Sequence, residues 1–255
     1  MLIYCNGDSF TSGHGLGDFL LPGYPGDSDI PPDKASPHIG KWAANTYSAN
    51  YTHRQDLNEQ IHIEESNRCW PAKLKKYGYN VINSAQPGSS MQRISRTTIT
   101  DLIELQQTNA NILAIISVPP VDRSEIYYKG WWVSFTHAHL ESVNYVPHLK
   151  NFYSELLLDD LDGYSSITRW YTSAIQIKDY CKANNIPLLW VNSLNPESVT
   201  DKFKDVNNLV KYLDIKYELT MAHLTSKGGY LPDGHFSEKV HDRTAQILAV
   251  KIKRI

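Results

Sequence analysis

The chain has 255 residues, with 25 Lys and Arg residues against 27 Asp and Glu residues and a formal net charge of -2. This balance excludes the basic surface expected of a nucleic-acid-binding protein. The 41% share of hydrophobic residues excludes a disordered chain. No run of about 18 apolar residues is present, so the sequence predicts no membrane span.

The cysteines and the first residues bear on the compartment. Cys5, Cys69 and Cys181 lie far apart without a Cys-x-x-Cys pair, which argues against a disulfide framework or a zinc site. The chain enters a strand-like run at Leu2, without the basic start and apolar stretch of a signal peptide. We therefore expect a cytoplasmic protein with reduced thiols.

Strand-like and helix-like segments alternate along the chain. Asn111 to Val118 is a nearly continuous apolar run, which suits a strand buried on both faces of a parallel sheet. In chain order, the pattern predicts a strand at Leu2 to Cys5, a helix at Pro71 to Tyr77, a strand at Tyr79 to Asn83, a helix at Met91 to Gln107, a strand at Asn111 to Val118, a helix at Ser165 to Asn184, a strand at Leu188 to Val191, and helices at Ser198 to Val210 and Glu238 to Ile252. This order predicts an α/β fold with a mainly parallel sheet.

Two long segments, about 11–67 and 119–164, lack a sustained apolar period. The first is rich in Gly and Pro, and we expect short helices in it, for instance around Lys41 to Ala49. We interpret the chain as one domain, residues 1–255, with these two segments as insertions. Trp131 and Trp132 in the second segment either wall a substrate pocket or pack the insertion against the domain.

A serine follows the first predicted strand at a turn. Gly7-Asp8-Ser9 lies outside the carboxyl end of that strand, where open α/β sheets bind their ligands. Taken alone, this tripeptide is more often a plain turn or a helix cap.

An acid and a histidine precede the last predicted helix. A serine hydroxyl is a poor nucleophile at neutral pH and needs a base within hydrogen-bond reach, and that base needs a carboxylate to fix its tautomer. Asp233 and His235 are candidates for these two groups, although a capping Asp and a surface His give the same pattern. Gly88, in the turn after the second strand, could bring a backbone N–H close to a substrate oxygen or could serve the turn alone.

Together and in this order, the three segments resemble the SGNH (GDSL-type) hydrolase family. The resemblance is carried by Gly7-Asp8-Ser9, by Asn-Ser-Ala-Gln-Pro-Gly-Ser at 83–89, and by Asp233-Gly234-His235. It implies a three-layer α/β/α flavodoxin-like fold and a serine esterase or deacetylase that acts on small O-acyl esters, often on carbohydrates. It implies no metal and no organic cofactor.

The resemblance also assigns roles to individual residues. Ser9 would be the nucleophile, His235 the general base and later the general acid, and Asp233 the carboxylate that orients His235. The backbone N–H groups of Ser9 and Gly88 would form part of the oxyanion hole.

Two departures from the family pattern affect these roles. The third strand ends in Ser-Val-Pro-Pro-Val-Asp-Arg at 117–123, without the family's Gly-x-Asn-Asp, and the loss of one oxyanion donor costs on the order of 10²–10³ in rate. Arg123 either reaches a substrate oxygen in its place or forms a structural salt bridge. The acid and base are also spaced Asp-x-His rather than Asp-x-x-His.

Three functions therefore stay open. The first is hydrolysis of a small-molecule or glycan ester through the triad. The second is a weak or inactive module of the same fold with a glycan-binding or structural role. The third is an acyltransferase that uses the same triad with a sugar hydroxyl as acceptor.

Two further patterns predict no site. Gly-His-Gly-Leu-Gly-Asp at 13–18 mimics a dinucleotide-binding fingerprint, but Asp18 stands where the third glycine is required. His137 and His139 have no acidic or Cys partner at metal-ligand spacing.

Overall fold

The computed structural model describes residues 1–21, 23–27, 57–109, 111–121, 123–128, 131–135, 164–193, 204–227, 229–231 and 234–255. The strands are β1 (Leu2–Asn6), β2 (Asn80–Asn83), β3 (Ile112–Val118), β4 (Ser124–Tyr128), β5 (Trp131–Phe135), β6 (Leu188–Asn192) and β7 (Tyr217–Thr220). The α-helices are α1 (Ser9–Ser12), α4 (Asn58–Arg68), α5 (Trp70–Leu74), α6 (Met91–Gln106), α8 (Tyr164–Ala183), α9 (Lys204–Leu213) and α10 (Glu238–Ile252). Short 3₁₀ helices are η1 (Asp18–Leu20), η2 (Lys75–Tyr77) and η4 (Met221–Lys227). Within these ranges, no helix has the length and apolar character needed to cross a bilayer.

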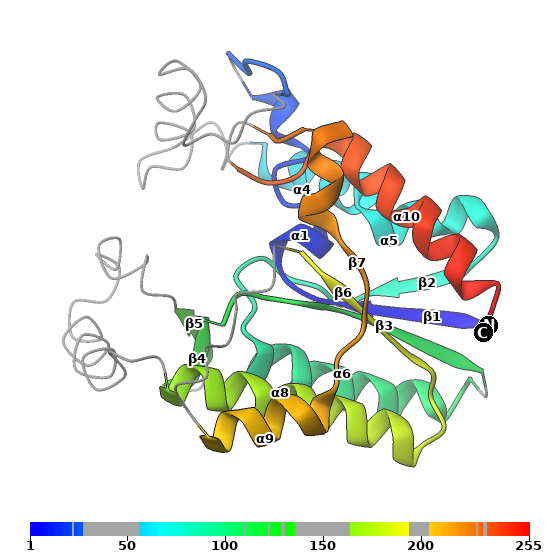
Figure 1. Ribbon diagram of the computed structural model, residues 1–255. Helices are drawn as coiled ribbons and strands as arrows, with labels where there is room; N and C mark the ends of the chain where they lie inside the picture. The colour runs from blue at the N-terminus through cyan, green and yellow to red at the C-terminus, as the bar shows by residue number, and fades with distance from the viewer. Residues whose placement is uncertain are drawn as a thin grey trace.

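Among the described residues, a parallel sheet of five strands has the order β2-β1-β3-β6-β7 (Figure 1). Counted along the chain, this is the order 2-1-3-4-5 of flavodoxin-like folds, in which ligands bind outside the carboxyl ends where the strand order reverses. Here the reversal lies at β1. Cys5 pairs with Asn83 of β2 and with Ile115 of β3, so the carboxyl ends of these three strands lie together.

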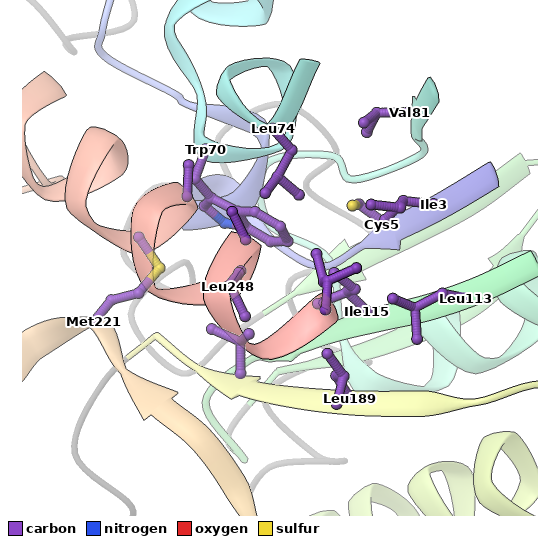
Figure 2. Packing of buried hydrophobic residues seen from close by; sticks show 14 of the residues in the cluster. Ile3, Cys5, Trp70, Leu74, Val81, Leu113, Ile115, Leu189, Met221 and Leu248 are labelled. Atoms are coloured by element: carbon purple, nitrogen blue, oxygen red, sulfur yellow. The ribbon is translucent and has the colours of Figure 1, made fainter. Parts of the chain in front are cut away.

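Helices cover both faces of the sheet. Ile3 and Cys5 point to one face, where they belong to a cluster with Trp70 of α5 and with residues of α10 (Figure 2). Leu2 and Tyr4 point to the other face and pack with residues of α6 and α8. Successive side chains of a strand alternate between faces, and both faces of β1 are buried, which explains its continuous apolar run. The described residues therefore confirm the α/β/α fold with a mainly parallel sheet.

Of the two segments expected to be irregular, the first was expected to contain short helices, but α4 lies at a position that was not predicted, and the two strands of the second were not predicted. Helix α4 lies in the first, and its buried residues are Ile61 and Glu65 within an otherwise polar sequence. Strands β4 and β5 lie in the second and pair antiparallel. The helix expected around Lys41 to Ala49 lies outside the described residues. So do residues 198–203 of the helix predicted at Ser198 to Val210, whose described part is α9. The organisation as a single domain stays a prediction.

The three cysteines are buried and not cross-linked. Burial raises the pKa of the Cys5 and Cys69 thiols and raises that of Cys181 to about 12. They are therefore neutral thiols of the core.

Candidate active site

Ser9 lies where β1 ends and α1 begins (Figure 1). Asp8 is the N-cap of α1, and its Oδ1 accepts the N–H of Phe10 at 3.1 Å. A short polar side chain at this position satisfies one of the backbone donors that the first helical turn leaves without a partner. The turn formed by residues 6–9, called the serine turn below, thus places Ser9 outside the carboxyl end of β1, as the sequence predicted.

Asn6 fixes the start of the serine turn to helix α6. Its Oδ1 accepts the N–H of Gly7 at 2.8 Å, and its Nδ2 lies 3.0 Å from the Tyr4 hydroxyl. The same nitrogen lies 2.9 Å from Oγ1 of Thr97 and 3.0 Å from Oγ1 of Thr98. Asn6 is completely buried, so this amide needs such partners. In the sequence alone, Asn6 indicates no more than a turn former that ends the strand.

Arg123 holds the serine turn from the segment that follows β3. Its Nη1 donates to Oδ2 of Asp8 at 2.8 Å, and the Asp8 side chain is completely buried. Burial raises the pKa of Asp8, and the positive charge of Arg123 opposes that shift. Of the two roles that the sequence left open for Arg123, the salt bridge is the one present here. A contact with substrate stays a prediction.

The loop that carries Gly88 is attached to the serine turn by backbone hydrogen bonds. The N–H of Ser84 donates to the carbonyl of Cys5 at 2.9 Å, and the N–H of Gln86 donates to that of Gly7 at 3.3 Å. Gly88 has a φ of +74°, in the left-handed region that favours glycine, and no heavy atom lies within 4 Å of the place a Cβ would take. The second motif thus lies beside the first, with open space at Gly88.

His235, from the loop before α10, contacts the segment that follows the serine turn. Its ring centroid lies 5.1 Å from that of Phe10 and 5.0 Å from that of His14. The next residue, Phe236, is completely buried with its ring 4.8 Å from Phe10, and the N–H of Leu231 donates to the carbonyl of His235 at 2.8 Å. His235 is therefore held against the residue that directly follows Ser9 in the chain.

Asp233, the carboxylate of the predicted triad, lies outside the described residues, so its contact with His235 stays a prediction. The backbone of Trp131 belongs to β5, but its side chain lies outside what is described, so its predicted contact with substrate stays a prediction.

Trp132 is half exposed on the layer formed by α6 and α8. The guanidinium of Arg96 lies 4.1 Å above its ring, and the ring of Tyr127 lies 5.3 Å away. Arg96 is fixed in turn by Glu125, at 3.2 Å. Trp132 lines a cleft of about 880 Å³ together with residues of α6 and α8. Its predicted contact with a substrate at Ser9 stays untested.

Glu65 is a buried charged residue that was not predicted from the sequence. Its Oε1 accepts the N–H of Gly15 at 2.8 Å and lies 3.3 Å from Nδ1 of His14, while Oε2 lies 3.0 Å from Nδ1 of His62. Burial raises the pKa of Glu65, but hydrogen bonds from His14, Gly15 and His62 outweigh burial and lower the pKa to about 2. Its spacing of four from the buried Ile61 was the available signal, because residues four apart share one helix face.

Within the part of the chain that is described, no three His, Cys, Asp or Glu side chains lie close enough together to hold a metal ion. His137 and His139 lie outside it. The groups gathered near the carboxyl end of β1 are a hydroxyl, an imidazole and backbone N–H donors. That set is suited to nucleophilic attack on an acyl carbon.

No protein-family model matches the chain, and no curated protein matches it. Solved structures with a similar backbone include a psychrotrophic esterase, EstA, from Pseudoalteromonas sp., with 10% identity, 99% of this chain and 97% of that chain covered, and a TM-score of 0.47. They include a family two carbohydrate esterase from Clostridium thermocellum, with 12% identity, 99% of this chain and 63% of that chain covered, and a TM-score of 0.48. A third, from Veillonella parvula, is a member of the lipolytic protein G-D-S-L family, whose motifs this sequence resembles. It has 12% identity, full coverage of both chains and a TM-score of 0.42. Identities this low do not transfer residue roles, so the roles of Ser9 and His235 depend on contacts within this chain.

Proposed function

We propose that the chain is an SGNH-type serine hydrolase that cleaves a small O-acyl ester, with Ser9 as nucleophile and His235 as general base. The observation that supports this most is the position of His235, whose ring packs 5.1 Å from the ring of Phe10, the residue next to Ser9. A serine hydroxyl becomes an effective nucleophile only with a base within reach. The fold brings the imidazole of His235 to the residue after Ser9, although 226 positions separate Ser9 from His235, and this supports the proposed pairing.

In the proposed reaction, Ser9 Oγ attacks the acyl carbon while His235 accepts the hydroxyl proton. The carbonyl oxygen becomes an oxyanion that accepts hydrogen bonds from the N–H groups of Ser9 and Gly88. The C–O bond to the alcohol then breaks, and His235 returns the proton to the leaving oxygen. Water then attacks the acyl carbon of the acyl-enzyme, with His235 again accepting and returning the proton, and this step releases the acid and the free Ser9 hydroxyl. Asp233 is proposed to orient His235 throughout.

We further propose a carbohydrate as the alcohol. The chain has 16 Tyr and 6 Trp residues, whose flat apolar faces and polar tips suit sugars. Trp132 presents such a surface, with 49% of it exposed. Release of acetate from an acetylated oligosaccharide, set against release from p-nitrophenyl acetate, tests this part separately. If the protein cleaves only the nitrophenyl ester, the proposed carbohydrate substrate is wrong and only the hydrolysis of small esters is supported.

The test of the nucleophile compares Ser9→Ala with Ser12→Ala. Both serines lie in α1, and Ser12 Oγ donates to the carbonyl of Ser9 at 3.2 Å, so Ser12→Ala is a control for disturbance of the helix. We expect a fluorophosphonate to label the wild type and Ser12→Ala at Ser9, and Ser9→Ala to lose both labelling and p-nitrophenyl acetate turnover.

The other outcomes point to the alternatives. A folded wild type that is neither labelled nor active would favour a non-catalytic module of the same fold. Labelling of Ser9 with transfer to a sugar acceptor exceeding hydrolysis would favour an acyltransferase.

A further inference from the structure

We propose that His14, held by Glu65, is a positioning residue for the general base His235. This inference rests on the proposed function, because it concerns the imidazole that takes the proton from Ser9. It adds a pair of residues that the three sequence motifs do not contain.

The ring of His235 contacts two rings from the segment that begins at Ser9. Phe10 contacts it with ring planes at 43°, and His14 contacts it edge-on at 79°, with centroids 5.1 and 5.0 Å away. These two contacts restrict rotation of the imidazole about its side-chain bonds. A base must hold its nitrogen within hydrogen-bond reach of the hydroxyl, so this restriction favours proton transfer.

His14 is in turn fixed relative to Ser9 through the backbone. Its N–H donates to the carbonyl of Ser9 at 3.1 Å, just beyond the end of α1. Gly13 passes so close to α4 that a Cβ there would lie 2.7 Å from the carbonyl oxygen of Glu65. The segment that carries His14 therefore lies directly on α4, with no side chain between the two backbones at this point.

Glu65 completes the arrangement by binding both the backbone and the ring. Its Oε1 accepts the N–H of Gly15 and lies 3.3 Å from Nδ1 of His14, and only 5% of its side chain is exposed. Since the pKa of Glu65 is lowered to about 2, the group is a carboxylate at neutral pH. The buried carboxylate thus fixes the orientation of the ring that contacts His235.

His62 provides a matched control. It is the other imidazole on Glu65, with Nδ1 3.0 Å from Oε2, but its side chain is 56% exposed on α4. Replacing His62 removes one partner of Glu65 without touching the ring that contacts His235. The variants to compare are therefore His14→Ala, Glu65→Gln and His62→Gln.

The experiment measures the rate of Ser9 phosphonylation per reactive site, the number of reactive sites, and kcat and KM for p-nitrophenyl acetate. We expect His14→Ala and Glu65→Gln to lower kcat and the phosphonylation rate by at least about tenfold, because a misplaced base slows proton transfer. We expect KM and the number of reactive sites to stay as in the wild type. His62→Gln should keep the wild-type rates.

Three results would overturn the inference. Wild-type rates in His14→Ala would show that the contact of His14 with His235 does not affect the reaction. If Glu65→Gln fails to fold, His14→Ala alone tests the inference. A loss of reactive sites at an unchanged rate per site, or an equal loss in His62→Gln, would show a merely structural role. A fourth result, a wild type that is never phosphonylated, would overturn the proposed function itself, which distinguishes that failure from the three others.

Discussion

Arg123 Nη1 lies 2.8 Å from Oδ2 of Asp8, a completely buried carboxylate directly before Ser9. The cation comes from the segment after β3, the place where the sequence lacks the Asn of the family pattern. A charge removed from water must be paired, because an isolated buried carboxylate is strongly unfavourable. The serine turn therefore depends on a residue 115 positions away for the charge balance of its helix cap.

We predict that Arg123→Ala lowers the free energy of unfolding by about 3–5 kcal/mol, since it leaves the Asp8 carboxylate buried without its cation. The same substitution in an Asp8→Asn background should cost about 1 kcal/mol, because Asn can still cap α1 and carries no charge. Urea unfolding of the four chains measures both values. Equal losses in the two backgrounds would show that the ion pair does not carry the effect.

Glu65 should make the protein sensitive to acid in a defined range. Its pKa falls from an ordinary value of 4.5 to about 2 in the folded chain, so the unfolded chain binds the proton first as the pH falls. The stability that Glu65 contributes is complete above pH 4.5 and is lost between 4.5 and about 2, up to about 3 kcal/mol. Urea unfolding at several pH values should show this loss in the wild type and not in Glu65→Gln. An unchanged slope in the variant would contradict the prediction.

Protonation of His241 should lower the stability of the protein at a higher pH than protonation of Glu65 does. Its Nδ1 accepts the N–H of Trp70 at 3.1 Å, and burial, followed by the charges of Lys73 and His235, lowers its pKa from 6.5 to about 3. The unfolded chain therefore binds a proton that the folded chain excludes, and stability falls as the pH drops below 6.5, by up to about 5 kcal/mol. His241→Asn keeps an acceptor for Trp70 but cannot titrate. Between pH 6.5 and 4.5, where Glu65 does not contribute, the variant should show a flatter stability profile than the wild type.

Gly88, the proposed oxyanion donor, can be compared with Gly78 as a matched control. Their φ values are +74° and +85°, and neither has a heavy atom within 4 Å of the place a Cβ would take. Gly78→Ala and Gly88→Ala should each cost about 1–2 kcal/mol, the penalty of a left-handed conformation. Gly88→Ala alone should also lower p-nitrophenyl acetate turnover by at least about tenfold, because relaxation of the loop moves its N–H. Equal activity in the two variants would count against Gly88 as a donor.

Long, strongly patterned elements were predictable from the sequence. The prediction for the last helix, Glu238 to Ile252, matches α10 at both ends, and that for β3 differs by one residue. Both bury one or two full faces, so their patterns are clear. Strand β7 was missed because its four residues are all half-buried and mix polar with apolar types. Helix α4 was missed because burial of Glu65 depends on a loop that is distant in sequence.

The site was predictable where it follows from the order of strands. Ser9 and Gly88 follow neighbouring strands, so the sheet brings them together. The residues that support them were not predictable. Which buried acid meets which cation or backbone donor depends on packing over 50 to 115 positions, as for Glu65 with Gly15 and Asp8 with Arg123. The spacing of neighbouring residues in the sequence does not predict such pairs.

The dispersal of these contacts along the chain has a consequence for folding. The segment from the serine turn to Gly15 is held by Glu65, by Gln86, by Arg123 and by the loop at His235. Each contact closes a long loop, whose entropy must be overcome before the contact forms. A chain that has not yet docked its last helix lacks the imidazole beside Phe10, and a fragment cannot assemble the arrangement. The chemical reactivity of one hydroxyl near the start of the chain should therefore report when folding of the whole molecule is complete.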